Sequence, residues 1–174
     1  MAKNFFLMAL TILFISAFEH QTFANYPTYL NGDRNFILCD GKMGTAWYVD
    51  RSSLNVHRYN PPNYIIAVNV VSASSAIGSE EDFYTRGGRG KIDSVKTYRF
   101  YYNSNDIKMY VENKPNDWVY LNPDGSWADT GIRMPAGEIA FALAYNKKFY
   151  GNLTRRSYDG KIYNIYSDDF YNRI

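Results

Sequence analysis

The chain contains a series of short segments in which apolar and polar residues alternate. A period of two residues is typical of strands with one covered and one exposed face. Residues 95–102 (VKTYRFYY) show it best, because Arg99 and Tyr101 fall on one face while Phe100 and Tyr102 fall on the other. By this criterion we predict strands over 36–39, 45–50, 54–59, 64–73, 95–102, 107–111 and 118–121.

Turn signals separate these segments. Residues 40–41 (DG) and 122–125 (NPDG) are typical turn sequences, because Pro presets φ and Gly permits a positive φ. Residues 64–73 (YIIAVNVVSA) form a continuous β-branched run, which predicts a central strand covered on both faces. Residues 74–94 are rich in Ser, Gly and charge, so we expect a long exposed loop there.

Three connections remain open at this stage. Residues 54–59 either extend the preceding strand or form its partner, and Pro61-Pro62 ends the run. Residues 126–128 are a candidate for a strand that pairs back on 118–121. Residues 161–166 are a candidate for a last strand, although their pattern does not settle the period.

One segment, residues 135–150, predicts a helix that packs on this sheet. Pro135 suits a first turn, Glu138 lies near the positive end, and Gly151 provides a stop. The side expected to face the sheet consists of Ile139, Ala142, Leu143, Asn146 and Phe149 or Tyr150. The fold class that follows is α+β, a mainly antiparallel sheet with one helix in the C-terminal half.

The N-terminal 24 residues predict export. A short basic start precedes a 14-residue apolar run over 5–18, and a polar stretch then ends in Ala24. This is the pattern of a signal peptide cut after Ala24; an uncleaved anchor is the alternative. We expect a single β-rich domain over 25–174, with its core at about 36–151, and no stable membrane span after cleavage. The periplasm, the cell surface and the extracellular space all fit.

Composition narrows the partners. The formal net charge is only +2 and there is no basic run, so nothing favours a nucleic-acid partner. Tyrosine is the most unusual component, with 17 residues. Tyrosine suits strands, and it also suits wet interfaces because its ring packs while its hydroxyl stays hydrated. A protein partner is therefore the expectation.

No combination of residues predicts catalysis or a cofactor. The lone Cys39 ends an apolar strand and is read as a small core residue, although in an exported protein it could also pair between chains. His57 is the only histidine after residue 24 and is read as structural. A hydrolase that uses Asp50 and Glu138 is a third alternative, because paired carboxylates across a cleft hydrolyse glycosides.

The remaining charged motifs are read as solvated. Residues 80–82 (EED) and 168–169 (DD) lack the converging ligands of a calcium site, so we predict no metal. Arg86, Arg89 and Lys91 form a glycine-rich basic loop, and they are the weak candidates for ligand binding through a polyanion. Residues 152–154 (NLT) match a glycosylation acceptor.

Several pieces resemble one family. Residues 47–50 (WYVD), the 64–71 strand and the 135–141 helix (PAGEIAF) are similar to the corresponding parts of small exported bacterial proteins related to surface-adhesin protein E. The resemblance covers about residues 36–151 and implies an antiparallel sheet with a helix packed on it. It also implies binding to host matrix or serum proteins. The chain departs from an anchored adhesin because it has no cysteine just after the apolar run.

These observations lead to one main expectation. The chain is expected to be an exported, non-enzymatic binding protein that resembles surface-adhesin protein E and needs no cofactor. The alternative is a periplasmic or envelope accessory protein that binds another bacterial protein.

Overall fold

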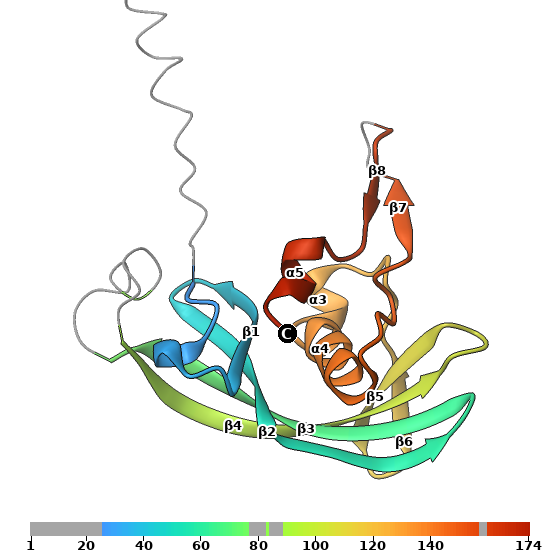
Figure 1. Cartoon of the computed structure of the whole chain (residues 1–174), viewed down its shortest axis with the longest axis horizontal. Helices are drawn as coiled ribbons and strands as arrows, with labels where there is room; N and C mark the ends of the chain where they lie inside the picture. Colours follow the sequence, from blue (N-terminus) through green and yellow to red (C-terminus); the bar gives the residue numbers. More distant parts are fainter. Residues whose placement is uncertain (1–25, 77–82, 84–88, 157–159) are drawn as a thin grey trace, which may run out of the picture.

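A computed structural model describes residues 26–76, 83, 89–156 and 160–174 (Figure 1). Six strands form one antiparallel sheet in the order of the chain. They are β1 (Phe36–Lys42), β2 (Thr45–Asn60), β3 (Asn63–Ser75), β4 (Gly90–Asn103), β5 (Lys108–Lys114) and β6 (Asp117–Tyr120). The prediction of a mainly antiparallel α+β fold is therefore confirmed at this level.

The helical and C-terminal elements lie on one side of this sheet (Figure 1). They are α3 (Trp127–Thr130), α4 (Arg133–Tyr145) and α5 (Asp168–Asn172). A second, two-stranded sheet pairs β7 (Thr154–Arg156) with β8 (Ile162–Asn164) and stands out from the body. Before β1 lies a short 3-10 turn, η1 (Leu30–Gly32).

Alternation along the strands divides the buried residues between two faces. Val49 of β2 and Val68 of β3 belong to the main core, which α4 covers, whereas Tyr48 and Val71 belong to a second core. The lead-in before β1 supplies Tyr26 and Leu30 to that second core, and Phe83 joins it. At the β1 end of the sheet, both faces are therefore covered, which agrees with the prediction for residues 64–73. At the β4–β6 end, the two cores cover only the face toward α4.

The structure corrects several predicted boundaries. The 40–41 turn is wrong, because β1 continues through these residues with a register shift between Leu38 and Asp40. Residues 54–59 extend β2. The predicted 126–128 strand is wrong, since Ser126 and Asp129 form a capping box that opens α3. The 74–94 loop is shorter than predicted, because β3 runs to Ser75 and β4 starts at Gly90.

The prediction of a single helix was right in place but wrong in extent and number, because the described residues also form α3 and α5. Helix α4 begins at Arg133 and ends at Tyr145, where Asn146 adopts a left-handed conformation that stops it five residues before Gly151. Its middle part, residues 136–141, is buried all round rather than along one side. The chain after α4 causes this difference, because it folds back over the helix. None of the helices in the described part of the chain combines the length and apolar character that a membrane crossing requires.

Candidate interaction surface on the free face of the sheet

A row of aromatic side chains crosses the face of β4, β5 and β6 that points away from α4. Tyr101 of β4 pairs with Tyr110 of β5, and Tyr110 pairs with Tyr120 of β6. Their neighbours Phe100, Tyr102, Met109 and Val111 are buried in the main core, so strand alternation turns the row outward. We call Tyr101, Tyr110, Trp118 and Tyr120 the aromatic strip.

Ring contacts link the strip into one unit. The ring centroids of Tyr101 and Tyr110 lie 5.6 Å apart, and those of Tyr110 and Tyr120 lie 5.5 Å apart. Trp118 reaches across β5 to Tyr101, with centroids 5.9 Å apart. Directly opposed aromatic residues on neighbouring strands stabilise a sheet, and these spacings are in the favourable range for ring pairs. The rings therefore hold one another in place.

A charged pair borders the strip. Nη1 of Arg99 donates to both carboxylate oxygens of Glu112, at 2.8 and 2.6 Å, and the Arg99 guanidinium lies 5.7 Å from the Trp118 ring. The hydroxyl of Tyr101 donates to Asn63 Oδ1 at 2.6 Å, on the other side of the strip. These polar contacts fix the side chains at the ends of the row.

The strip combines apolar area with access to solvent. Tyr120 is 40% exposed, Tyr101, Tyr110 and Trp118 are half-buried, and Val95 of the same face is 59% exposed. The groups that this surface offers are apolar ring faces with phenol and indole polar atoms. Its four rings contact one another and belong to neither of the two core clusters.

Glu138, one of the two candidate hydrolase acids, lies in the main core. Its carboxylate accepts hydrogen bonds from the backbone N–H of Phe149 at 2.7 Å, from that of Tyr150 at 2.9 Å and from the Tyr171 hydroxyl at 2.6 Å. Burial raises the pKa of Glu138, and these donors oppose the rise. The side chain is fully buried, and its three hydrogen bonds tie residues 149–150 and Tyr171 to α4.

The other acid lies elsewhere and has a different partner. Asp50 of β2 is partly exposed, and its Oδ1 accepts from the hydroxyl of Ser52 at 2.6 Å. Glu138 is closed to solvent and holds three donors, so the two carboxylates do not share a cleft. This geometry favours structural roles for both.

Cys39 and His57 lie in different environments, one buried and the other exposed. Cys39 is buried in β1, and burial raises the pKa of its thiol well above the ordinary value. His57 lies exposed in β2. Because the reactive form of cysteine is the thiolate, a buried thiol of raised pKa is a poor nucleophile.

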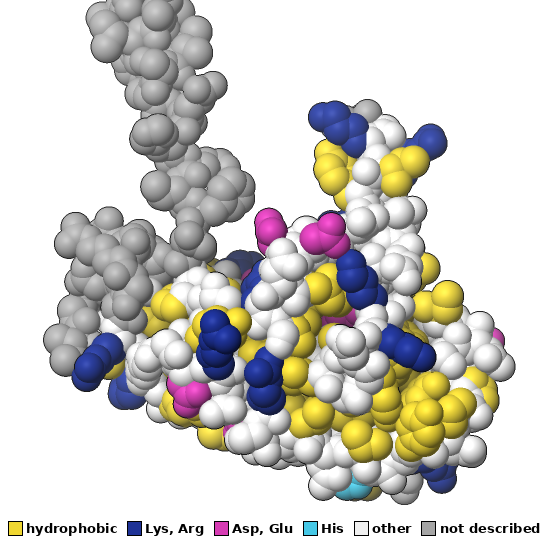
Figure 2. Space-filling view, viewed as in Figure 1, with side chains coloured by type: hydrophobic (Ala, Val, Ile, Leu, Met, Phe, Trp, Pro, Cys, Tyr) yellow, Lys and Arg dark blue, Asp and Glu magenta, His cyan; other side chains and the backbone are white. Residues whose placement is uncertain are grey.

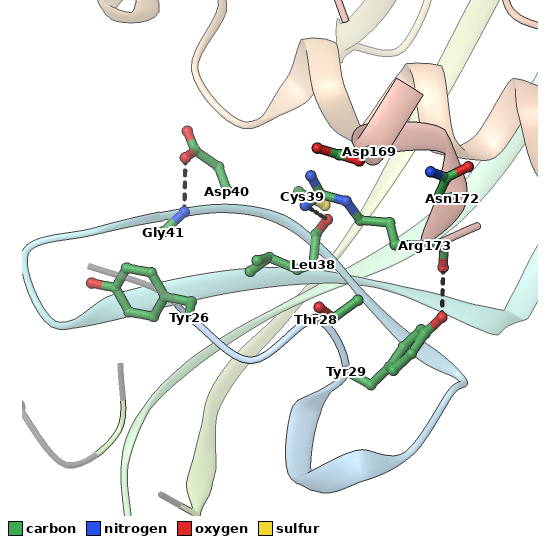
Figure 3. Close-up of a pocket in the computed structure, with 10 residues that line it drawn as sticks. All are labelled: Tyr26, Thr28, Tyr29, Leu38, Cys39, Asp40, Gly41, Asp169, Asn172 and Arg173. Atoms are coloured by element: carbon green, nitrogen blue, oxygen red, sulfur yellow. Dashed lines mark hydrogen bonds between the residues drawn. The ribbon is translucent and has the colours of Figure 1, made fainter. Parts of the chain in front are cut away.

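A cleft of about 550 Å³ runs between β1, the lead-in and α5 (Figure 3). Arg173 extends from the end of α5 toward β1, and its Nη1 donates to the Leu38 carbonyl at 3.3 Å. The Tyr29 hydroxyl donates to the Arg173 carbonyl at 3.0 Å. These two contacts hold the end of α5 against β1 and the lead-in, which favours a structural role for this part of the cleft.

The described residues of the basic loop and of the acidic motifs form no ligand-binding cluster. Arg86, residues 80–82 and Ala24 lie outside the described residues. Arg89 is exposed, and Lys91 at the start of β4 lies 3.6 Å from Asp93. Asp168 begins α5 and pairs with Lys148 at 2.9 Å. In the part of the chain that the structure describes, His, Cys, Asp and Glu form no group suited to a metal ion.

Sequence reasoning placed Arg99 and Tyr101 on one face but did not find the strip. Its other members lie on two further strands, and only the register brings them together. The available signal was the tyrosine content combined with the alternation over 95–102. Comparison of this chain with protein-family models, with curated proteins and with solved structures found no match.

Proposed function

We propose that this chain is an exported, non-enzymatic binding protein that engages a protein partner through the aromatic strip. The observation that carries the proposal is the row of Tyr101, Tyr110 and Tyr120 on a sheet face that α4 does not cover. The resemblance to surface-adhesin protein E makes host matrix or serum proteins the first partners to test.

The chemistry of the strip favours a protein over a small ligand. Tyr, Trp and Arg dominate the residues that contribute most to protein interfaces, and the strip with Arg99 contains all three types. Tyr and Trp also bury a large area while losing few rotatable bonds. A stable interface covers about 800 Å² on each partner. A flat face that crosses three strands suits such an area better than an enclosed pocket would.

The experiment is a retention assay with residues 25–174 immobilised. Purified fibronectin, laminin, collagen and whole serum are passed over it, beside an unrelated β-sheet domain as control. We expect one of these to be retained above the control, with little loss when salt is raised, because aromatic packing is not screened. Retention no greater than on the control would count against the proposal.

The accessory-protein alternative differs in where the partner resides. Protease treatment of intact cells separates the two, because an adhesin must reach the cell surface. Cleavage of the chain supports a host partner. Protection until the envelope is opened supports an internal envelope partner instead.

A further inference from the structure

The β7–β8 hairpin projects from the body on the α4 side of the main sheet (Figure 1). We call Thr154–Arg156, Lys161 and Ile162–Asn164 the arm. All six strand residues of the arm are exposed. Ile162 is 64% exposed and Tyr163 is 47% exposed, so the arm presents apolar side chains to solvent.

The arm combines these apolar side chains with cations. Arg155 lies opposite Tyr163, and Arg156 lies opposite Ile162. Figure 2 shows basic and hydrophobic side chains together on the projecting hairpin. Residues 154–164 carry three cations and one acid, a net charge of +2 that equals the net charge of the whole chain. The protruding arm therefore lies in a segment with an excess of positive charge, whereas the charges of the rest of the chain cancel.

We propose that the arm binds the headgroup region of an anionic lipid bilayer. The two guanidinium groups suit lipid phosphates, because arginine binds phosphate in a bidentate manner. Tyrosine is favoured at the boundary between headgroups and acyl chains, and Ile162 adds apolar area at the same depth. Cross-strand pairing places each apolar side chain directly beside a cation, which is the arrangement this boundary requires.

The size of the arm favours a bilayer over an acidic protein. Two strands of three residues present far less than the roughly 800 Å² that a stable protein interface covers on each side. A membrane surface needs only a few side chains at once, since each added Lys or Arg near it strengthens binding about fivefold. This proposal is independent of the aromatic strip, which lies on the opposite face of the main sheet.

The test is co-sedimentation of residues 25–174 with vesicles of phosphatidylglycerol and phosphatidylcholine, beside vesicles of phosphatidylcholine alone. The first variant is Arg155→Gln with Arg156→Gln, and the second is Ile162→Ser with Tyr163→Ser. The matched control is Lys96→Gln with Lys108→Gln, which removes the same charge from exposed positions of the main sheet. Thermal unfolding confirms that every variant is folded.

We expect the wild-type chain to bind the anionic vesicles only, and the arginine variant to bind about 25-fold more weakly. The serine variant should also lose binding at unchanged charge, whereas the control should lose less than about threefold. Equal losses in the arginine variant and the control would overturn the proposal. So would binding to heparin beads without binding to vesicles, which would identify a general polyanion site. Tyr120→Ser, which removes one ring of the aromatic strip, should leave vesicle binding unchanged.

Discussion

Glu138 connects three parts of the chain through one carboxylate. Its carboxylate oxygens accept hydrogen bonds from the backbone of Phe149 and Tyr150 and from the side chain of Tyr171. These residues lie 11, 12 and 33 positions away in the sequence. A buried donor that loses its acceptor costs about 1–3 kcal/mol. The residue therefore determines how the chain after α4 returns over the helix.

Glu138→Gln should destabilise the fold by about 1–3 kcal/mol, because an amide nitrogen cannot accept a hydrogen bond, whereas both oxygens of a carboxyl group keep acceptor lone pairs in either protonation state. The loss should depend on pH. The raised pKa means that the folded chain holds the Glu138 proton more tightly than the unfolded chain does. Its contribution is complete below the ordinary pKa of 4.5 and falls as pH rises through the folded pKa.

As the pH rises, the wild-type chain loses the stabilisation that comes from proton binding at Glu138. The glutamine variant has no proton-binding group at this position, so its stability lacks this pH dependence. The difference in unfolding free energy between the two chains should therefore narrow as the pH rises from about 4.5 through the raised pKa of Glu138. Urea unfolding at a series of pH values measures this difference. A difference that widens with pH would contradict the raised pKa.

Cys39 is the second residue with a sharp expectation. It is 7% exposed, and burial raises the pKa of its thiol, so the folded chain should resist alkylation and remain a monomer on non-reducing gels. We expect native protein to react with iodoacetamide at least about 100-fold more slowly than protein in urea. Rapid native labelling, or a reducible dimer, would show that the thiol reaches the surface.

At the scale of elements, the strands were largely predictable. Alternation over 95–102 depends only on neighbouring residues, and β4 reproduces it with Phe100 and Tyr102 inward. The end of α4 was less predictable, because Asn146 rather than a glycine takes the left-handed position. Glu138 was read as an acid near a helix start, since the sequence could not show that Phe149, Tyr150 and Tyr171 would contact it.

Helix α4 approaches the sheet closely at Gly137. A Cβ there would lie against the sulfur of Met109 and 3.0 Å from the Phe100 ring, and the Gly137 carbonyl accepts from the Tyr102 hydroxyl at 2.8 Å. Glycine is thus required by packing, even though it weakens a helix by about 1 kcal/mol relative to alanine.

Gly137→Ala should therefore destabilise the chain by about 1–3 kcal/mol, against the gain expected from helix propensity. Ala144→Gly, at a half-buried position of the same helix, serves as the comparison and should cost about 1 kcal/mol. Thermal and urea unfolding report both values. Stabilisation by Gly137→Ala would mean that α4 and the sheet are less tightly packed than described.

At the scale of the whole molecule, the two proposed surfaces lie on opposite sides. The arm projects on the side of α4 (Figure 1), and strand alternation places the aromatic strip on the sheet face turned away from α4. A chain held to a bilayer by its arm would present the strip outward. This arrangement could not be predicted from the sequence, because it depends on the pairing of β4, β5 and β6 and on the separate β7–β8 sheet.

The most direct test of the account is the affinity of strip variants for the protein that the retention assay identifies. Tyr120→Ser and Trp118→Ala remove rings from the edge strand, and Tyr59→Ser removes a tyrosine that is 68% exposed outside the strip. We expect each strip variant to raise Kd at least about tenfold and Tyr59→Ser to leave it within about twofold. Unchanged affinity in both strip variants, with the fold intact, would contradict the claim that this face binds the partner.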